Sequence, residues 1–162
     1  MQVRVLVEIP KGSRNKYELD HESGRLRLDR ALHSAVHYPT DYGFIENTMS
    51  DDGDPLDALI LIEEPTFPGC LVDVRPVGAF LMSDEKGGDE KILCIPLGDP
   101  TWNHVTELDQ VASHRLAEIE NFFQIYKQLE GKETVTFGWR DRSVAEELVT
   151  RAFGQATGTP TT

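Results

Sequence analysis

Four aspartates occupy seven consecutive positions near the middle of the chain. Asp51, Asp52, Asp54 and Asp57 stand directly before the apolar run ALILI. Carboxylates at this density repel one another unless water or cations separate them. Three interpretations are open: a solvated turn, a calcium loop, and a metal site that performs catalysis.

The spacing excludes an EF-hand calcium loop. Counted from Asp52, the third position is Asp54, but the fifth is Leu56 and the sixth is Asp57, where that loop requires glycine. The flanking sequence predicts no pair of helices either. A solvated turn stays open, because the segment DDGDP consists of residues that turns favour.

A second acidic group stands in the same relation to an apolar strand. Asp84 and Asp89 flank a Gly-Gly pair just before the run ILCIP. Carboxylates at two strand entrances can face one cavity, where hard oxygen ligands, water and an anionic substrate would surround several Mg²⁺ ions. Glu85 and Glu90 are interpreted as solvated residues of the turn.

An anionic ligand would also need fixed cations and hydroxyl groups. Taken singly, each basic candidate is more simply a solvated surface charge. The two tyrosines of YPTDYGF, interpreted as a Pro/Gly loop, either pack or present their hydroxyls, and the third tyrosine shares an apolar helix face. The candidates are Lys16, Arg30, Lys91, Lys127, Tyr38, Tyr42 and Tyr126.

Several other chemistries lack their motifs. The sequence contains no G-x-x-x-x-G-K-[ST] or G-x-G-x-x-G loop and no G-x-S-x-G element. The histidines form no convincing zinc pair; His33 and His37 are interpreted as polar surface, and the role of His21 is open. Metal-assisted attack by water on a phosphate is therefore favoured over nucleotide-driven transfer and acyl chemistry.

Composition narrows the functional class further. Sixteen basic and 28 acidic residues give a net charge of −12, which argues against nucleic-acid binding. No apolar run is long enough for a membrane span, and the N-terminus does not resemble a signal peptide. Cys70 and Cys94 suggest no disulfide framework. We expect a cytoplasmic enzyme or binding protein.

The elements that position the candidate residues are mostly strands. Residues 2–9 alternate apolar and polar side chains, and residues 16–30 are typical of a hairpin whose turn contains Gly24. Pro- and Gly-rich segments separate three further strands, predicted at 57–62, 70–82 and 91–96.

Two helices are predicted after the strands. The first spans 114–129, with Ser113 as its N-cap and Gly131 beyond its end. The second begins with a Ser-Glu capping box at 143–146 and ends near residue 153.

Strands followed by helices favour an α+β fold built on a β-barrel or a compact sheet. A length of 162 residues suits one domain. We predict a single domain at 1–154 and a disordered tail at 155–162.

The motifs, in chain order, resemble those of the prokaryotic type of soluble family I inorganic pyrophosphatases. The match runs from about residue 3 to about residue 140, and DGDPLD after a YG segment is its most specific part. The matching segments are EIPKGSRNKYELD, DR, YPTDYGFI, DGDPLDALIL, RPVG, MSDEKGGDEKILCIP and FFQIYKQLE.

The resemblance implies an OB-like five-stranded β-barrel with flanking α-helices. It implies an inorganic diphosphatase of phosphate metabolism, which hydrolyses pyrophosphate to two orthophosphates with water activated by several Mg²⁺ ions. Mn²⁺ or Zn²⁺ are expected substitutes, and a homohexamer is the expected assembly.

The resemblance also assigns roles to the acidic residues. Asp52, Asp57 and Asp89 would hold a first ion, with Asp57 reaching a second. Asp84 and Asp89 would bind a third that arrives with substrate, and Glu8 would lie near a fourth. Water shared by two metal ions loses a proton near neutral pH. Asp54 is the favoured acceptor of that proton and Asp89 the alternative, a choice that the sequence leaves open. Asp51 is interpreted as a bystander.

The remaining matched residues would bind the phosphates and stabilise charge on the leaving group. These are Lys16, Arg30, Tyr42, Lys91, Tyr126 and Lys127, with Glu18 and Tyr38 in supporting positions. Two other functions remain open: a metal-dependent hydrolase of organic phosphoesters, and a non-catalytic OB-like binding module. The sequence does not fix the oligomeric state or the number of ions bound without substrate.

Overall fold

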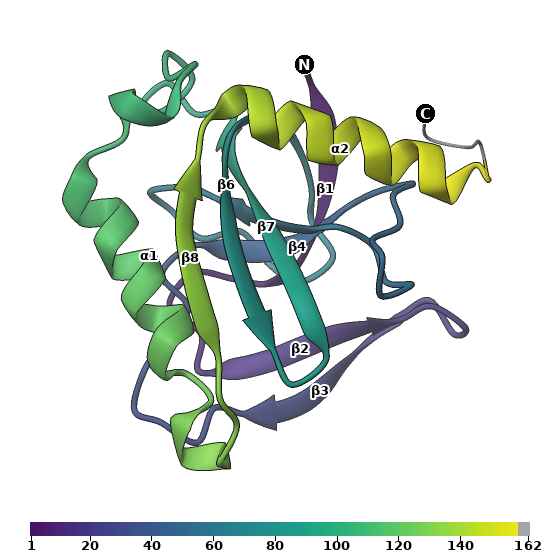
Figure 1. The fold of residues 1–162 in the computed structure, drawn as a ribbon, viewed down its shortest axis with the longest axis vertical. Coiled ribbons are helices and arrows are strands. Elements are labelled where there is room, and N and C mark those ends of the chain that lie inside the picture. The colour runs from purple at the N-terminus through teal and green to yellow at the C-terminus, as the bar shows by residue number, and fades with distance from the viewer. Residues whose placement is uncertain (159–162) are drawn as a thin grey trace.

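Five strands close into a ring, drawn in Figure 1. The structure is a computed structural model that describes residues 1–158. Strands β5 and β7 pair in parallel, the other neighbours are antiparallel, and β1 pairs with both β4 and β6 to complete the ring. The predicted α+β fold with a five-stranded barrel is confirmed. In ring order the strands are β1 (Val3–Ile9), β4 (Asp41–Ile45), β5 (Asp57–Ile60), β7 (Gly87–Pro96) and β6 (Leu71–Asp84).

Strand β6 belongs to the ring and also extends past it. Its first residues, up to Val74, pair with β1, whereas the segment from Ala79 to Ser83 pairs with β8 (Val135–Arg140). A separate hairpin, β2 (Asn15–Asp20) and β3 (Arg25–Ala31), follows β1.

Strands β4 and β8 were not predicted from the sequence. Strand β4 lies in the segment interpreted as a loop, and it is buried on both faces, so it shows no alternation of polar and apolar residues. Gly43 belongs in this strand because β1 passes very close: an added Cβ would lie 1.9 Å from the carbonyl oxygen of Leu6. In β8, Gly138 has a φ of +83° beside a shift in the pairing with β6. Glycine in both strands weakened the sequence signal.

Helix α1 (Ser113–Ile125) is shorter than predicted. The chain leaves the α-helix at Tyr126, and a 3₁₀ turn, Gln128–Glu130, ends at Gly131, whose φ is +71°. The predicted N-cap is wrong, since Ala112 holds that position. Another 3₁₀ turn, Leu108–Gln110, precedes the helix.

Helix α2 (Arg142–Ala156) begins at a different cap from the one predicted. Asp141 is the N-cap, and its carboxylate accepts hydrogen bonds from the Val144 amide and the Ser143 hydroxyl. The predicted capping box of Ser143 and Glu146 is therefore wrong. The helix also includes residues 155 and 156, which were predicted as tail; residues 159–162 of that tail lie outside the described residues.

Two apolar clusters lie on opposite faces of the central strands. In β5, Ala58 and Ile60 join a cluster with α2, whereas Leu59 joins a cluster with α1. The same alternation occurs in β7, at Ile92 and Leu93. These strands are buried on both faces and so form a rigid support for the residues at their entrances. Within residues 1–158, no helix has the length and apolar character required to span a bilayer.

Candidate active site

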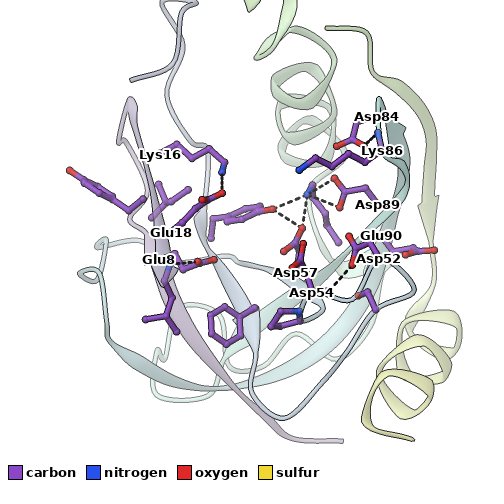
Figure 2. A pocket seen from close by; sticks show the side chains of 18 of the residues that line it. Glu8, Lys16, Glu18, Asp52, Asp54, Asp57, Asp84, Lys86, Asp89 and Glu90 are labelled. Atoms are coloured by element: carbon purple, nitrogen blue, oxygen red, sulfur yellow. Dashed lines mark hydrogen bonds and ion pairs between the residues drawn. The ribbon is translucent and has the colours of Figure 1, made fainter. Parts of the chain in front are cut away.

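A cavity of about 390 Å³ opens beside the entrances of β5 and β7. In Figure 2, Glu8, Lys16 and Glu18 lie on one side, and Asp57 and the other labelled aspartates lie on the other. Most of the residues singled out in the sequence therefore meet in one place. Those that line the cavity are Glu8, Lys16, Glu18, Tyr42, Asp52, Asp54, Asp57, Asp84, Asp89, Lys91, Tyr126 and Lys127.

Parallel pairing of β5 and β7 brings the two acidic groups together. Asp57, the first residue of β5, pairs in register with Lys91 of β7. The entrances of neighbouring parallel strands share one edge of a sheet. Asp89, two residues before Lys91, thus lies on the same strand face and at the same edge.

Lys91 lies at the centre of this edge, with its side chain 2% exposed. Its Nζ donates to the Tyr42 hydroxyl at 2.8 Å, to Oδ2 of Asp57 at 3.0 Å and to Oδ1 of Asp89 at 3.1 Å. The Tyr42 hydroxyl donates in turn to Oδ2 of Asp57 at 2.8 Å. The ammonium also lies 5.0 Å from the ring centres of Tyr42 and Phe123, as cation–π contacts require.

Protonation states follow from these contacts. Burial by itself would lower the pKa of Lys91, but the charge of Asp57, with Tyr42 and Asp89, raises that pKa well above its ordinary value. Burial raises the pKa of the Tyr42 hydroxyl. Burial and the neighbouring Asp57 raise the pKa of Asp89, while Lys91 opposes the change. The lysine is therefore charged and the tyrosine protonated near neutral pH.

Glu8 and the β2 residues form the facing wall. The Glu8 carboxylate accepts a hydrogen bond from the Leu19 amide at 2.8 Å, and burial raises its pKa to about 7. Lys16 pairs with Glu18, its neighbour on the same strand face, and with Asp29 at 3.3 Å. This wall thus carries both an acidic and a basic group.

Lys127 closes the cavity from the end of α1. Its Nζ lies 3.3 Å from Oδ2 of Asp84 and 3.6 Å from Oε1 of Glu85. Burial would lower the pKa of Lys127, but Tyr126 and Asp84 raise it. Partial burial would raise the pKa of Asp84, but the Lys86 amide and the Lys127 charge lower it. Both groups are charged, so this contact is an ion pair.

Asp52 and Asp54 lie in the exposed loop before β5. The Asp54 amide donates to Oδ1 of Asp52 at 2.9 Å, which shapes the turn. Both side chains are accessible to water where they line the cavity.

Two predicted residues do not line the cavity. Arg30 pairs across the hairpin with Lys16, but its guanidinium forms an ion pair with Glu130, with Nε 2.8 Å from Oε1. Tyr38 is buried, and its ring lies 5.5 Å from that of Tyr42.

The cavity also includes residues to which the sequence analysis gave no role in it. Lys86 lies between Asp84 and Asp89 in the turn. This position between two candidate ligands was a signal by which the sequence would have identified it. His21 lines the cavity, and its ring lies 5.5 Å from that of Phe44. The others are Ile9, Tyr17, Leu19, Phe44, Ser50, Pro55, Gly88 and Glu90.

The donor set suits divalent cations that prefer oxygen ligands. Carboxylates line the cavity on both walls, and hard oxygen donors of this kind favour Mg²⁺ or Mn²⁺ over softer metals. Among residues 1–158, no three acidic, histidine or cysteine side chains are gathered at ligand distance. Asp57 and Asp89 are instead arranged around the Lys91 ammonium, so the pair already accommodates a cation.

Comparison with known proteins decides the family. The family model described as inorganic pyrophosphatase matches residues 5–157. The chain belongs to the inorganic pyrophosphatase family. It is 53% identical to the inorganic pyrophosphatase of Streptomyces coelicolor over 94% of both chains, and 54% identical to that of Methanosarcina mazei over 91% of this chain and 88% of the relative.

Solved pyrophosphatases share the fold. The crystal structure of the inorganic pyrophosphatase from Thermus thermophilus superposes with a TM-score of 0.94 and 44% identity, over 97% of this chain and 92% of that one. The OB-like barrel with flanking helices is thereby confirmed. The chain is a hydrolase of pyrophosphate, and membership of the family implies dependence on divalent metal ions.

Proposed function

We propose that the cavity around Lys91 is the site of pyrophosphate hydrolysis and that Mg²⁺ is the cation used there. The observation that carries this proposal is the convergence of twelve predicted residues on one cavity. A strongly acidic chain gains affinity for a polyanion only through cations. Seven of those twelve residues are carboxylates, and five of the seven are the predicted ligands. A cytoplasmic homohexamer is the proposed form of the enzyme.

The proposed metal ligands are Asp52, Asp57, Asp84, Asp89 and Glu8. Divalent cations held by these residues would neutralise phosphate charge and would lower the pKa of the attacking water. Asp54 accepts the proton of that water in our proposal, because its carboxylate lines the cavity and is accessible to water. Asp89 is the alternative acceptor.

The basic residues and tyrosines orient the substrate. Lys16 and Lys127 approach the cavity from opposite walls, so they suit the two ends of a pyrophosphate. Lys91 donates to both Asp57 and Asp89, and its bond to the Tyr42 hydroxyl keeps that hydroxyl pointed at Asp57. Groups fixed in this way stabilise charge on the leaving phosphate without reorganising during the reaction. Arg30 would have to leave Glu130 to take part.

Phosphate release from pyrophosphate tests the proposal. We expect turnover with Mg²⁺, loss of turnover with EDTA, and recovery when Mg²⁺ is added in excess of the chelator. Parallel assays with Mn²⁺ and Zn²⁺ establish which cation the site prefers. Full activity in EDTA would contradict the role of the cation, and sedimentation analysis of the same sample tests the hexamer.

Substrate range distinguishes the proposed function from hydrolysis of organic phosphoesters. The cavity is small and ringed by charged groups, which suits a compact polyanion better than an ester with a large organic part. With Mg²⁺ present, we expect strong preference for pyrophosphate over ATP and p-nitrophenyl phosphate. Equal rates would favour the phosphoesterase instead.

A further inference from the structure

The loop that carries Asp52 and Asp54 is held mostly by contacts within itself. The Ser50 amide donates to the Asp54 carbonyl at 2.7 Å, and the Gly53 amide donates to the Ser50 carbonyl at 3.0 Å. The Asp54 amide bonds to the Asp52 carboxylate. These bonds fix the shape of the turn but leave its position relative to the cavity undetermined.

Asp51 connects this loop to helix α2. Its two carboxylate oxygens accept from Nη2 of Arg151 at 2.8 and 3.0 Å, and Oδ1 also accepts from Nε2 of Gln155 at 2.8 Å. Beside this contact, the Met49 amide donates to the Ala152 carbonyl at 3.0 Å. Within residues 1–158, Asp51 is the one side chain of the segment 49–54 with a hydrogen bond or ion pair to another element.

Packing does not replace these polar contacts. A cavity of about 20 Å³ lies between the loop and α2, and both Asp51 and Arg151 border it. Asp51 and Arg151 are more than half exposed, and exposed ion pairs contribute little to global stability. Their effect is therefore expected on the placement of the loop, because among residues 1–158 no other side chain of segment 49–54 makes a hydrogen bond or ion pair to α2.

We propose that Asp51, Arg151 and Gln155 form a clamp through which α2 positions the loop of Asp52 and Asp54. Asp51 is a positioning residue and does not touch substrate. The clamp sets the affinity of the cavity for divalent cations, a consequence that rests on the proposed function. The bound species whose affinity depends on the clamp is the metal ion. The part of α2 that holds Asp51 lies about a hundred residues away from it in sequence.

Two single variants separate positioning from simple electrostatics. Asp51→Asn removes a negative charge near the cavity, whereas Arg151→Met removes a positive one. If only long-range charge mattered, Asp51→Asn would weaken Mg²⁺ binding and Arg151→Met would strengthen it. The clamp predicts that both weaken it, by about tenfold, as is typical when partners that orient metal ligands are lost.

Calorimetric titration with Mg²⁺ and steady-state kinetics measure this effect. We expect the half-saturating Mg²⁺ concentration to change more than kcat at saturating cation. The double variant should resemble either single variant, because one clamp is lost in all three. The matched control is Arg142→Met, a substitution on the same helix as Arg151. It removes the 2.8 Å ion pair of Arg142 with Glu107, and both of these side chains are 43% exposed.

Hydrogen exchange in the metal-free protein gives a readout that is independent of catalysis. We expect the Met49 amide, which donates to the Ala152 carbonyl beside the clamp, to exchange faster in both clamp variants and at the wild-type rate in the control. Wild-type Mg²⁺ affinity or tighter binding in Arg151→Met would overturn the proposal, as would unchanged exchange of this amide. A wild-type enzyme that needs no divalent cation would contradict the proposed function instead, and the exchange result would still decide whether the clamp exists.

Discussion

Lys91 and Asp57 form an ion pair inside the protein, with Nζ 3.0 Å from Oδ2 and the lysine 2% exposed. The ion pair joins strand β7 to Asp57, the first residue of the parallel neighbour β5. Asp89 and the Tyr42 hydroxyl share the same ammonium. One lysine thus holds together the two acidic groups that the sequence shows 32 residues apart.

Lys91→Met should destabilise the metal-free protein strongly. The variant leaves Asp57 and Asp89 without their cation, and breaking a buried pair in this way costs about 3–5 kcal/mol. Added Mg²⁺ should reduce the deficit, because it provides positive charge for the same carboxylates. Thermal unfolding in EDTA and in Mg²⁺ measures both effects. Lys86→Met, which removes an exposed lysine of the same cavity, is the control and should unfold near the wild-type temperature.

Asp54→Asn and Asp89→Asn should have different effects on kcat and on Mg²⁺ affinity. If Asp54 accepts the proton, its amide variant loses about 10²–10⁴ in kcat, the usual contribution of a general base, with a smaller change in Mg²⁺ affinity. Asp89→Asn should weaken Mg²⁺ binding as well, since Asp89 is a proposed ligand. Rates measured over a Mg²⁺ titration separate the two effects. A large loss of kcat in Asp89→Asn alone would assign the proton to Asp89.

Glu8 should make the metal-free protein less stable as the pH rises. Burial raises its pKa from 4.5 to about 7, so the folded state binds more protons than the unfolded state between these values. The free energy of unfolding therefore falls across this window, by at most about 3 kcal/mol from this group. Above pH 7 the penalty is complete.

Glu8→Gln should remove that pH dependence. The amide keeps an acceptor for the Leu19 amide but cannot ionise. Urea unfolding in EDTA at pH 5 and pH 8 should show the variant gaining stability relative to wild type at the higher pH. An equal difference at both values would contradict the raised pKa.

Gly43→Ala should disrupt the contact between β1 and β4. Its Cβ would lie 1.9 Å from the Leu6 carbonyl oxygen, which is backbone and cannot rotate away. Separating the strands should cost about 1–3 kcal/mol or more, as overpacked sites do, and should lower activity because Tyr42 is adjacent. Gly98→Ala is the matched control, since an added Cβ there meets no atom within 4 Å. Equal unfolding free energies for the two variants would refute the argument.

Local patterns were sufficient to predict most strands. The alternation of β1 and the turn glycine of the hairpin predicted both elements, and the two acidic groups predicted a cation site. Strand β4 was missed because a doubly buried strand loses alternation and Gly43 is required by β1, which is distant in sequence. The helix caps were wrong by one or two residues, because several side chains near each start were able to cap it.

The sequence by itself determined which residues can bind a cation or a phosphate, since carboxylates, lysines and tyrosines have that chemistry wherever they lie. Only the tertiary structure decided which of them meet. Parallel pairing placed Asp57 beside Lys91, and the pairing of Arg30 with Glu130 kept that arginine out of the cavity lining. It also gave Asp51 a partner on α2. Such contacts depend on strand register and helix placement, which are set by burial over the whole chain rather than by local spacing.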